Sequence, residues 1–132
     1  MSTENRVLDL AFEANEDLSN DQYRFVVIDA TTGKVRRPDA ANEKAIGVLQ
    51  NAPAAGEAAV VRVEGVSKLQ AAAGGLTLNS MITAEYVSAA DAGKGLITTT
   101  AGDYVRGIVI GAAAAEDDLG SVRLVDFHYA IT

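Results

Sequence analysis

Short β-favouring runs, separated by turn residues, are the feature that most limits how this chain folds. The runs begin at Tyr23 and are rich in Val, Ile, Thr and aromatic residues, which fit a pleated, half-buried surface. Gly, Asp, Asn and Pro stand between them and favour turns. The runs are residues 23–29, 34–36, 45–50, 58–64, 67–70, 80–87, 96–100, 104–110 and 121–127. Nine short strands predict a mainly β fold, a compact antiparallel β-sandwich or barrel-like domain.

Two of these runs alternate apolar and charged residues. Residues 61–64 read Val-Arg-Val-Glu, and residues 122–124 read Val-Arg-Leu. Antiparallel strands with one face toward water show this alternation. Short helical turns are predicted at residues 39–44, 88–92 and 112–119. The last of these ends in three acidic residues, which the helix dipole disfavours, so a simple turn is the alternative there.

One pattern occurs twice in the sequence. Residues 47–49 read Gly-Val-Leu and are followed by an Ala-rich connection, a glycine and the run Val-Arg-Val. Residues 107–109 read Gly-Ile-Val and are followed by four alanines, a glycine and the run Val-Arg-Leu. A duplicated supersecondary unit would produce this echo, and so would a coincidence of two Ala-rich loops. Both explanations agree with a hairpin-rich β fold.

The first 20 residues differ from the rest of the chain. They show no sustained strand or helix period, which predicts an extended N-terminal arm at residues 1–20 and a β-rich domain at residues 21–132. Residues 1–21 contain six acidic side chains and one basic one, which is five of the seven excess negative charges. A frayed terminus is the alternative. The arm is more apolar than a solubility tail, however, which predicts a binding role for Val7, Leu8, Leu10 and Phe12.

The residue types that carry most catalytic and metal chemistry are scarce. His128 is the single histidine, and there is no cysteine with which to build a metal or nucleophile site. Glu116, Asp117 and Asp118 are consecutive, so their side chains diverge, which indicates a solvated loop, with a weak Ca²⁺ site as the alternative. We therefore expect no enzyme activity and no cofactor.

The charge and hydropathy of the chain exclude two further classes of partner. The net charge of −7 argues against nucleic acid, because binding a phosphate backbone needs clustered Lys and Arg. No stretch of the sequence approaches the ~18 apolar residues of a membrane span. We therefore expect a partner other than nucleic acid or a membrane.

Three segments carry a resemblance to a known family. They are residues 17–27, residues 47–58 and residues 63–68, and the final hairpin around residues 104–125 fits as well. Together they resemble the small capsid decoration, or cement, proteins of tailed phages. The resemblance implies a β-rich homotrimer on the outside of the phage head. It further implies an N-terminal segment that bridges neighbouring major capsid proteins. It brings no catalytic residues. Synthesis in the host cytoplasm is expected because the N-terminus has no positively charged region followed by an apolar run.

A different class of protein competes with this interpretation. A trimeric β-sandwich fibre or adhesin module that binds host-surface carbohydrate would also be acidic and rich in glycine. Such a module needs aromatic side chains arranged as stacking platforms. The sequence offers only three Phe and four Tyr, and most of them occupy alternating strand positions. The structural role on a phage head is therefore the function that the sequence favours.

Overall fold

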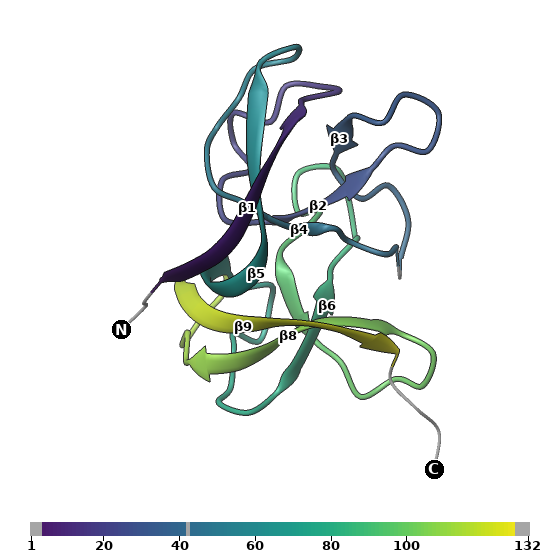
Figure 1. Cartoon of the computed structure of the whole chain (residues 1–132). Helices are drawn as coiled ribbons and strands as arrows, with labels where there is room; N and C mark the ends of the chain where they lie inside the picture. The colour runs from purple at the N-terminus through teal and green to yellow at the C-terminus, as the bar shows by residue number, and fades with distance from the viewer. Residues whose placement is uncertain (1–3, 42, 129–132) are drawn as a thin grey trace.

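The described residues of the computed structural model are 4–41 and 43–128, the last two by their backbone alone. They form nine β-strands and no helix, which confirms the mainly β fold. The strands are β1 (Asn5–Glu13), β2 (Phe25–Ile28), β3 (Val35–Arg36), β4 (Gly47–Leu49), β5 (Ala58–Gln70), β6 (Met81–Ala84), β7 (Gly95–Ile97), β8 (Tyr104–Gly111) and β9 (Leu119–His128). All strand pairs are antiparallel within one curled sheet (Figure 1).

Followed inward from either end of the sheet, the strands are arranged in the same way. The strand order is β3-β2-β4-β5 followed by β9-β8-β6-β7, so strands β2 to β5 and strands β6 to β9 repeat one arrangement. The sequence echo lies at corresponding places in the two halves. Val48 pairs with Arg62 in the first half, and Ile108 pairs with Arg123 in the second. This agreement of topology and register favours a duplicated unit over a coincidence of loops.

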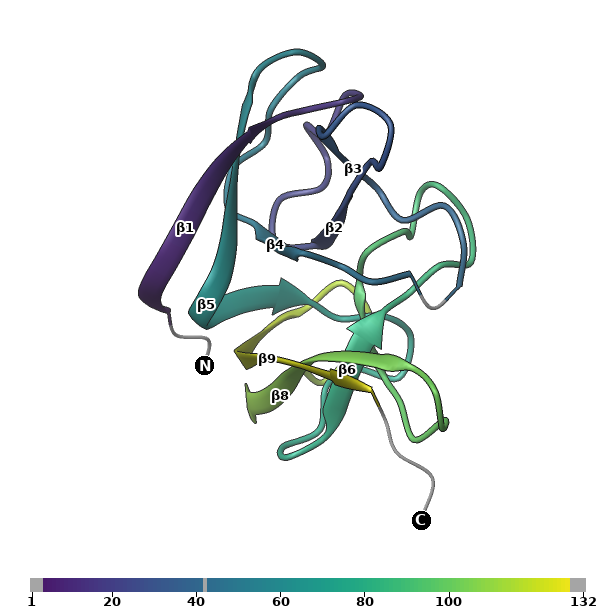
Figure 2. The ribbon, with the colours of Figure 1, turned by 45° about the vertical axis from the view of Figure 1, so that its right-hand side comes forward.

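Strand β5 connects the two halves and is far longer than expected. The sequence predicted two strands, at residues 58–64 and 67–70, but the chain stays extended through 13 residues. β5 bends along its length (Figure 2), and Val66 pairs with Asn5 of β1 on one edge and with Arg123 of β9 on the other. Gly65 beside this point has a φ of +109°, a conformation that side chains other than glycine rarely adopt.

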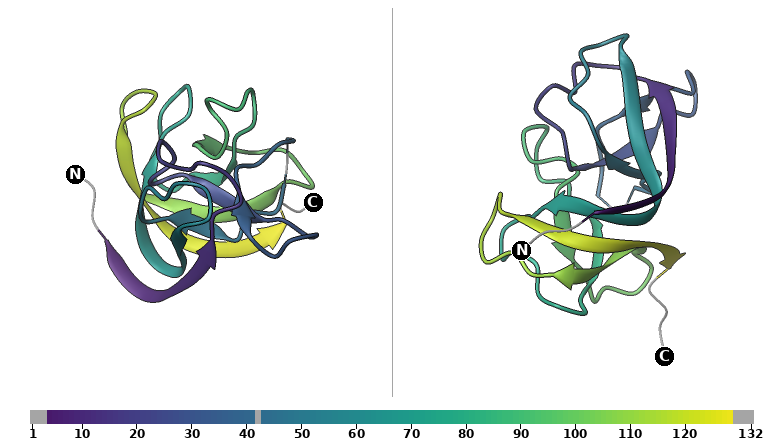
Figure 3. Two further views of the ribbon diagram at one scale, coloured as in Figure 1. Left: turned by 90° about the horizontal axis from the view of Figure 1, so that it is seen from above. Right: turned by 60° about the vertical axis from the view of Figure 1, so that its left-hand side comes forward.

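The first strand occupies the segment where the sequence indicated none. β1 pairs with β5 from Asn5 opposite Val66 to Glu13 opposite Ala58. The two strands run side by side in every view (Figure 3). The expectation that residues 1–20 lack a regular strand is therefore wrong for Asn5–Glu13, although this segment is extended as predicted.

The core consists of two clusters of buried apolar side chains. The larger is built on Phe25, Leu69, Ile82, Val109 and Val122. The smaller lies among β2 to β5 and contains Ala14, Leu18, Val26, Val35, Leu49, Ala59 and Val61. Ala14 and Leu18 belong to the segment expected to be an arm, so the apolar core of the domain includes side chains from before residue 20.

The predicted helical turns take other forms. Residues 88–92 form turns and bends, and residues 112–119 form a loop with one isolated bridge at Ala113 before β9 begins. The described part of residues 39–44 is irregular, and Asn42 lies outside the described residues. Within the described chain no helix has the length and apolar character needed to cross a membrane.

Candidate functional site

Strand β1 is the longest strand with an unpaired edge in the described chain. Its only strand partner there is β5, and a single parallel bridge from Ala14 to Val35 follows its end. The register slips between Arg6 and Leu8, so that Val7 has no residue opposite it and is 66% exposed. Bulges of this kind re-aim side chains at sheet edges. Unpaired N–H and C=O groups along such an edge form a ready template for another strand.

The apolar side chains expected to bind a partner divide into two groups. Val7, Leu8 and Leu10 are exposed on β1. Phe12 is half-buried and packs against the smaller core cluster. The structure thus brings three of the four predicted residues to one exposed strand and uses the fourth to anchor that strand on the core.

A buried arginine holds β1 in place. The Arg62 Nε donates to Asp9 Oδ1 at 2.9 Å, and its Nη1 donates to Glu4 Oε2 at 3.0 Å and to the Val66 carbonyl at 3.1 Å. The hydrogen bond with Asp9, followed by the charge of Asp9 and the bond with Glu4, outweighs burial and raises the pKa of Arg62. Arg62 is therefore a β1 anchor that the alternating pattern had assigned to a solvent-facing position.

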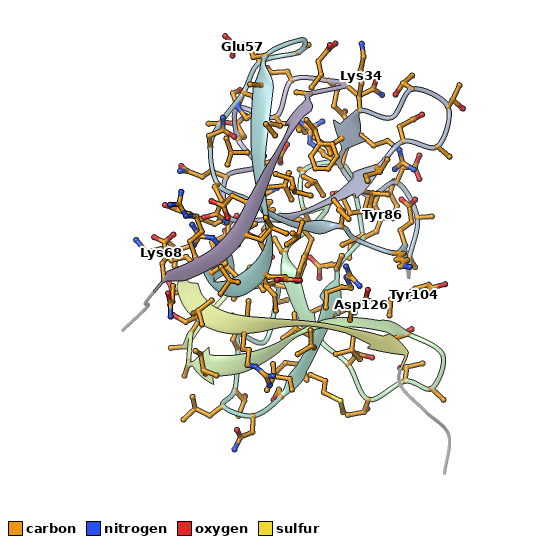
Figure 4. All side chains as sticks on the ribbon, in the orientation of Figure 1. Lys34, Glu57, Lys68, Tyr86, Tyr104 and Asp126 are labelled. Atoms are coloured by element: carbon orange, nitrogen blue, oxygen red, sulfur yellow. The ribbon has the colours of Figure 1, made fainter. Side chains whose placement is uncertain are left out.

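Two acidic side chains of the N-terminal segment pair with lysines of the domain. Glu13 Oε2 lies 2.6 Å from Lys34 Nζ, and Glu4 Oε1 lies 3.5 Å from Lys68 Nζ. Figure 4 shows Lys68 and Lys34 near opposite ends of β1. The negative charge of this segment is thus largely neutralised within the molecule.

Beyond β1 the same charge pairing continues into the core. Arg37 contacts Glu16 Oε1 at 2.8 Å and the buried Asp21 Oδ2 at 2.7 Å, and Arg24 lies 3.2 Å from Asp21 Oδ1. Burial raises the pKa of Asp21 although both arginines act to lower it. The segment between β1 and β2 is therefore fixed to the domain by buried charge as well as by Leu18.

Gly65 allows β1 to approach β5 closely. A Cβ on this residue would lie 2.3 Å from the Asn5 carbonyl oxygen and 2.8 Å from the Val7 nitrogen. Both atoms are backbone atoms, so a side chain at position 65 would force the two strands apart. The glycine is a requirement of the β1–β5 contact, and sequence analysis had treated it only as a gap between two strands.

The acidic cluster at residues 116–118 binds a cation supplied by the chain itself. The buried Lys94 Nζ lies 2.6 Å from Asp117 Oδ1, 2.7 Å from Asp91 Oδ1 and 3.3 Å from Glu116 Oε2. Burial by itself lowers the pKa of Lys94, but the bonds to these three carboxylates together raise it above its ordinary value. Glu116 and Asp117 are therefore not simply solvated: they connect the β8–β9 loop to the turn before β7. Among the described residues, no group of His, Cys, Asp and Glu is placed to hold a metal ion.

The ion pair between Arg36 and Glu43 lies near β3, and its contribution to stability depends on pH. The Arg36 fork donates to both Glu43 oxygens, at 3.1 and 2.9 Å. Hydrogen bonding from Arg36, opposed by burial, lowers the pKa of Glu43 from 4.5 to about 2. A lowered acid pKa contributes stability that is complete above 4.5 and is lost as pH falls toward about 2.

We therefore expect Glu43→Gln to lower the melting temperature at pH 7 and to have almost no effect at pH 2. Burial raises the pKa of Asp21 and Glu85, so these two groups change the stability with pH in the opposite direction. Both proteins contain them, so their contribution cancels in the difference between the two melting temperatures. Thermal unfolding of both proteins across this pH range measures that difference. Glu64→Gln is the control, since Glu64 is exposed. A Glu43→Gln deficit that persists unchanged at pH 2 would contradict the assignment.

Comparison with known proteins identifies the family of this chain. The family model described as phage cement protein matches residues 1–124, which is most of the chain and includes β1. The chain belongs to the phage cement protein family. Members of this family are structural, and this cement protein is a component of the phage head that associates with the capsid. Comparison with curated protein sequences gives no match.

A solved structure shares the fold of this cement protein. It is described as the crystal structure of head fiber gp8.5 N base in bacteriophage phi29. The TM-score is 0.66 and the sequence identity is 15%, with 89% of this chain and 93% of the other chain covered. At 15% sequence identity this similarity shows that the two proteins share a fold and nothing about a shared role.

The aromatic residues of the cement protein bear on the carbohydrate-binding alternative. Phe25 is fully buried, and the Tyr23 ring lies 5.6 Å beneath Lys68 Nζ. Tyr86 and Tyr104 are half-buried on the side of the molecule away from β1 (Figure 4). The side chains of Phe127 and His128, and all of Tyr129, lie outside the described residues. Phe25 is therefore not available to stack on a carbohydrate ring.

Proposed function

We propose that this cement protein binds the outside of the assembled capsid through β1 and bridges neighbouring major capsid protein subunits. The observation that supports this most directly is β1 itself, with an unpaired edge and with Val7, Leu8 and Leu10 exposed. An extended edge gives backbone hydrogen bonds to an incoming strand, and alternate side chains enter pockets. A ligand that binds only the assembled shell shifts the equilibrium toward that shell.

The ion pairs of β1 suit this role. Ordering a free segment costs roughly 1–2 kcal/mol per residue of backbone entropy. Because Arg62, Lys34 and Lys68 already hold β1 on the domain, most of that cost falls on folding and not on capsid binding. A preorganised strand therefore binds more tightly than a mobile arm with the same side chains.

We further propose that the protein acts as a homotrimer on the capsid. Linking three copies would raise the effective concentration of each β1 once the first has bound. Light scattering of the free protein and the copy number per head test this. Strictly dimeric protein in both states would contradict it, because a twofold assembly does not match a threefold site.

Charged substitutions on β1 test the capsid-binding role. Val7→Asp together with Leu10→Asp should weaken decoration of undecorated heads by tenfold or more, because both side chains would have to lose water to enter apolar pockets. Sedimentation of heads with bound protein, at fixed salt, measures the affinity. Both positions are exposed, so the melting temperature should change little.

The control for this experiment places the same charges elsewhere. Leu78 and Val87 are also exposed apolar residues, but they lie outside β1. Leu78→Asp together with Val87→Asp matches the charge change and should leave decoration within about twofold. If the control weakens decoration as much as the β1 variant does, attachment lies elsewhere on the surface.

A further inference from the structure

A cleft of about 510 Å³ lies beside β2 and reaches the β8–β9 pair. Its walls include the apolar residues Val27, Ile28, Ala45 and Ile46. They also include the charged residues Arg36, Glu43, Lys44, Arg106 and Asp126. A second hollow, of about 310 Å³, shares Ile46, Arg106 and Asp126 with the first. Asp126 lies between the upper and lower halves of the molecule in Figure 4. The volume is in the range of sites that accept a few side chains.

Arg106 in this cleft is buried with donors that lack partners. It is 7% exposed, and its Nε has no hydrogen bond among the described residues. Among the residues that the structure describes, its Nη2 makes only a 3.5 Å contact with the Ile46 carbonyl, and its Nη1 pairs with Asp126. Burial lowers the pKa of Arg106, with Asp126 acting in the opposite direction.

This arrangement differs from that of the other paired arginines. Arg36 and Arg62 each make several hydrogen bonds to carboxylates, so their forks are well satisfied. A buried donor without a partner costs free energy, and a cleft that keeps one is suited to a partner that satisfies it. The Asp126 side chain is 62% exposed, so water can solvate this carboxylate when another carboxylate replaces it beside Arg106.

We propose that the Arg106 cleft receives an Asp or Glu side chain from an otherwise apolar, extended segment of a capsid subunit. The charge is complementary, because a guanidinium fork binds a carboxylate through two parallel hydrogen bonds. The apolar walls fit the residues that flank the carboxylate. This proposal rests on the proposed capsid binding and adds a second contact away from β1.

The test compares Arg106→Met with Arg123→Met on undecorated heads. Arg123 is exposed on β9 and forms no ion pair among the described residues, so its substitution matches the change in charge. We expect Arg106→Met to keep or raise the melting temperature, because it removes a buried, poorly paired charge, and to weaken decoration by tenfold or more. Equal decoration by the two variants at a temperature where both are folded would overturn the proposal.

Two further measurements keep the outcome decisive if Arg106→Met folds poorly. Asp126→Asn removes the resident carboxylate that competes with the incoming one, so we expect it to bind heads several-fold more tightly. Equal or weaker binding counts against the cleft.

The second measurement is a cross-link from Lys44, which lies on the rim of the cleft. A carbodiimide should couple its amine to a capsid carboxylate in decorated heads. Absence of this cross-link, when other cross-links to the capsid form, would also count against it.

The same experiments separate this inference from the proposed function. If the wild-type protein does not bind heads, capsid binding itself is wrong. If wild-type and Arg106→Met protein bind equally while the β1 variant binds poorly, the β1 contact stands and only the cleft is wrong.

Discussion

Replacing Leu18 by alanine is expected to lower the free energy of unfolding by about 3 kcal/mol, within the range measured for buried leucines. Leu18 is 0% exposed and packs in the cluster with Ala14, Val26 and Leu49. Its backbone nitrogen also donates to the Pro53 carbonyl at 2.9 Å, which fixes the side chain in the core. For a domain of this size the loss corresponds to roughly 10 °C in melting temperature, and thermal and denaturant unfolding measure it.

Leu78→Ala is the matched control, because Leu78 is 56% exposed. That substitution should change the stability by less than about 0.5 kcal/mol. If Leu18→Ala is as mild as Leu78→Ala, residues 14–20 do not belong to the folding unit. If the expected loss is found, the boundary of the stable domain lies before Ala14, and a deletion meant to remove only the binding segment should stop there.

Much of the β architecture was predictable because its strands follow local rules. The runs that became β2 to β9 are bounded by residues with a physical reason to turn, and the Val-Arg alternation at residues 61–64 and 122–124 indicated antiparallel strands, which β5 and β9 are. The strand limits were less predictable. Residues 80–87 shorten to Met81–Ala84, because the chain bends and turns over residues 87–93 before β7 begins.

The strand β1 could not be recognised in the same way, because local apolar alternation does not specify it. Its outer side is exposed, so no apolar period is required there. Its position depends on Arg62, which lies 53 residues from Asp9 in the sequence, and on the space left by Gly65. A sequence shows the acidic residues of this segment but not which bases they meet.

The charged residues of the cleft and of the β8–β9 loop show the same limit. Arg106 sits in a strand where the sequence gives no sign that its fork is buried, because an arginine in an alternating strand usually faces water. Glu116 and Asp117 were read as a solvated loop, since Lys94 is 22 residues away and its approach depends on the tertiary fold. In each case the missing information is a long-range charge contact.

The anchor of β1 gives the other large effect that we expect. Arg62→Met should destabilise the protein by about 3 kcal/mol, because it leaves the half-buried Asp9 carboxylate and Glu4 without their main partner. Hydrogen exchange of the β1 amides should become faster than that of β8, since β1 loses its tie to β5. Decoration of heads should weaken as well, because a mobile β1 must be ordered again on the capsid.

A second substitution separates the charge contact from simple packing. Asp9 lies directly opposite Arg62 in the β1–β5 register, so Arg62→Met combined with Asp9→Leu replaces the pair by two apolar side chains. Such a replacement is often neutral, and we expect it to recover most of the lost stability and the slow exchange of β1. Arg6→Met, on the exposed side of β1, is the control and should change stability by less than about 0.5 kcal/mol. If the double variant is no more stable than Arg62→Met alone, unpaired charge is not the cause of the loss, and β1 is held mainly by its backbone hydrogen bonds.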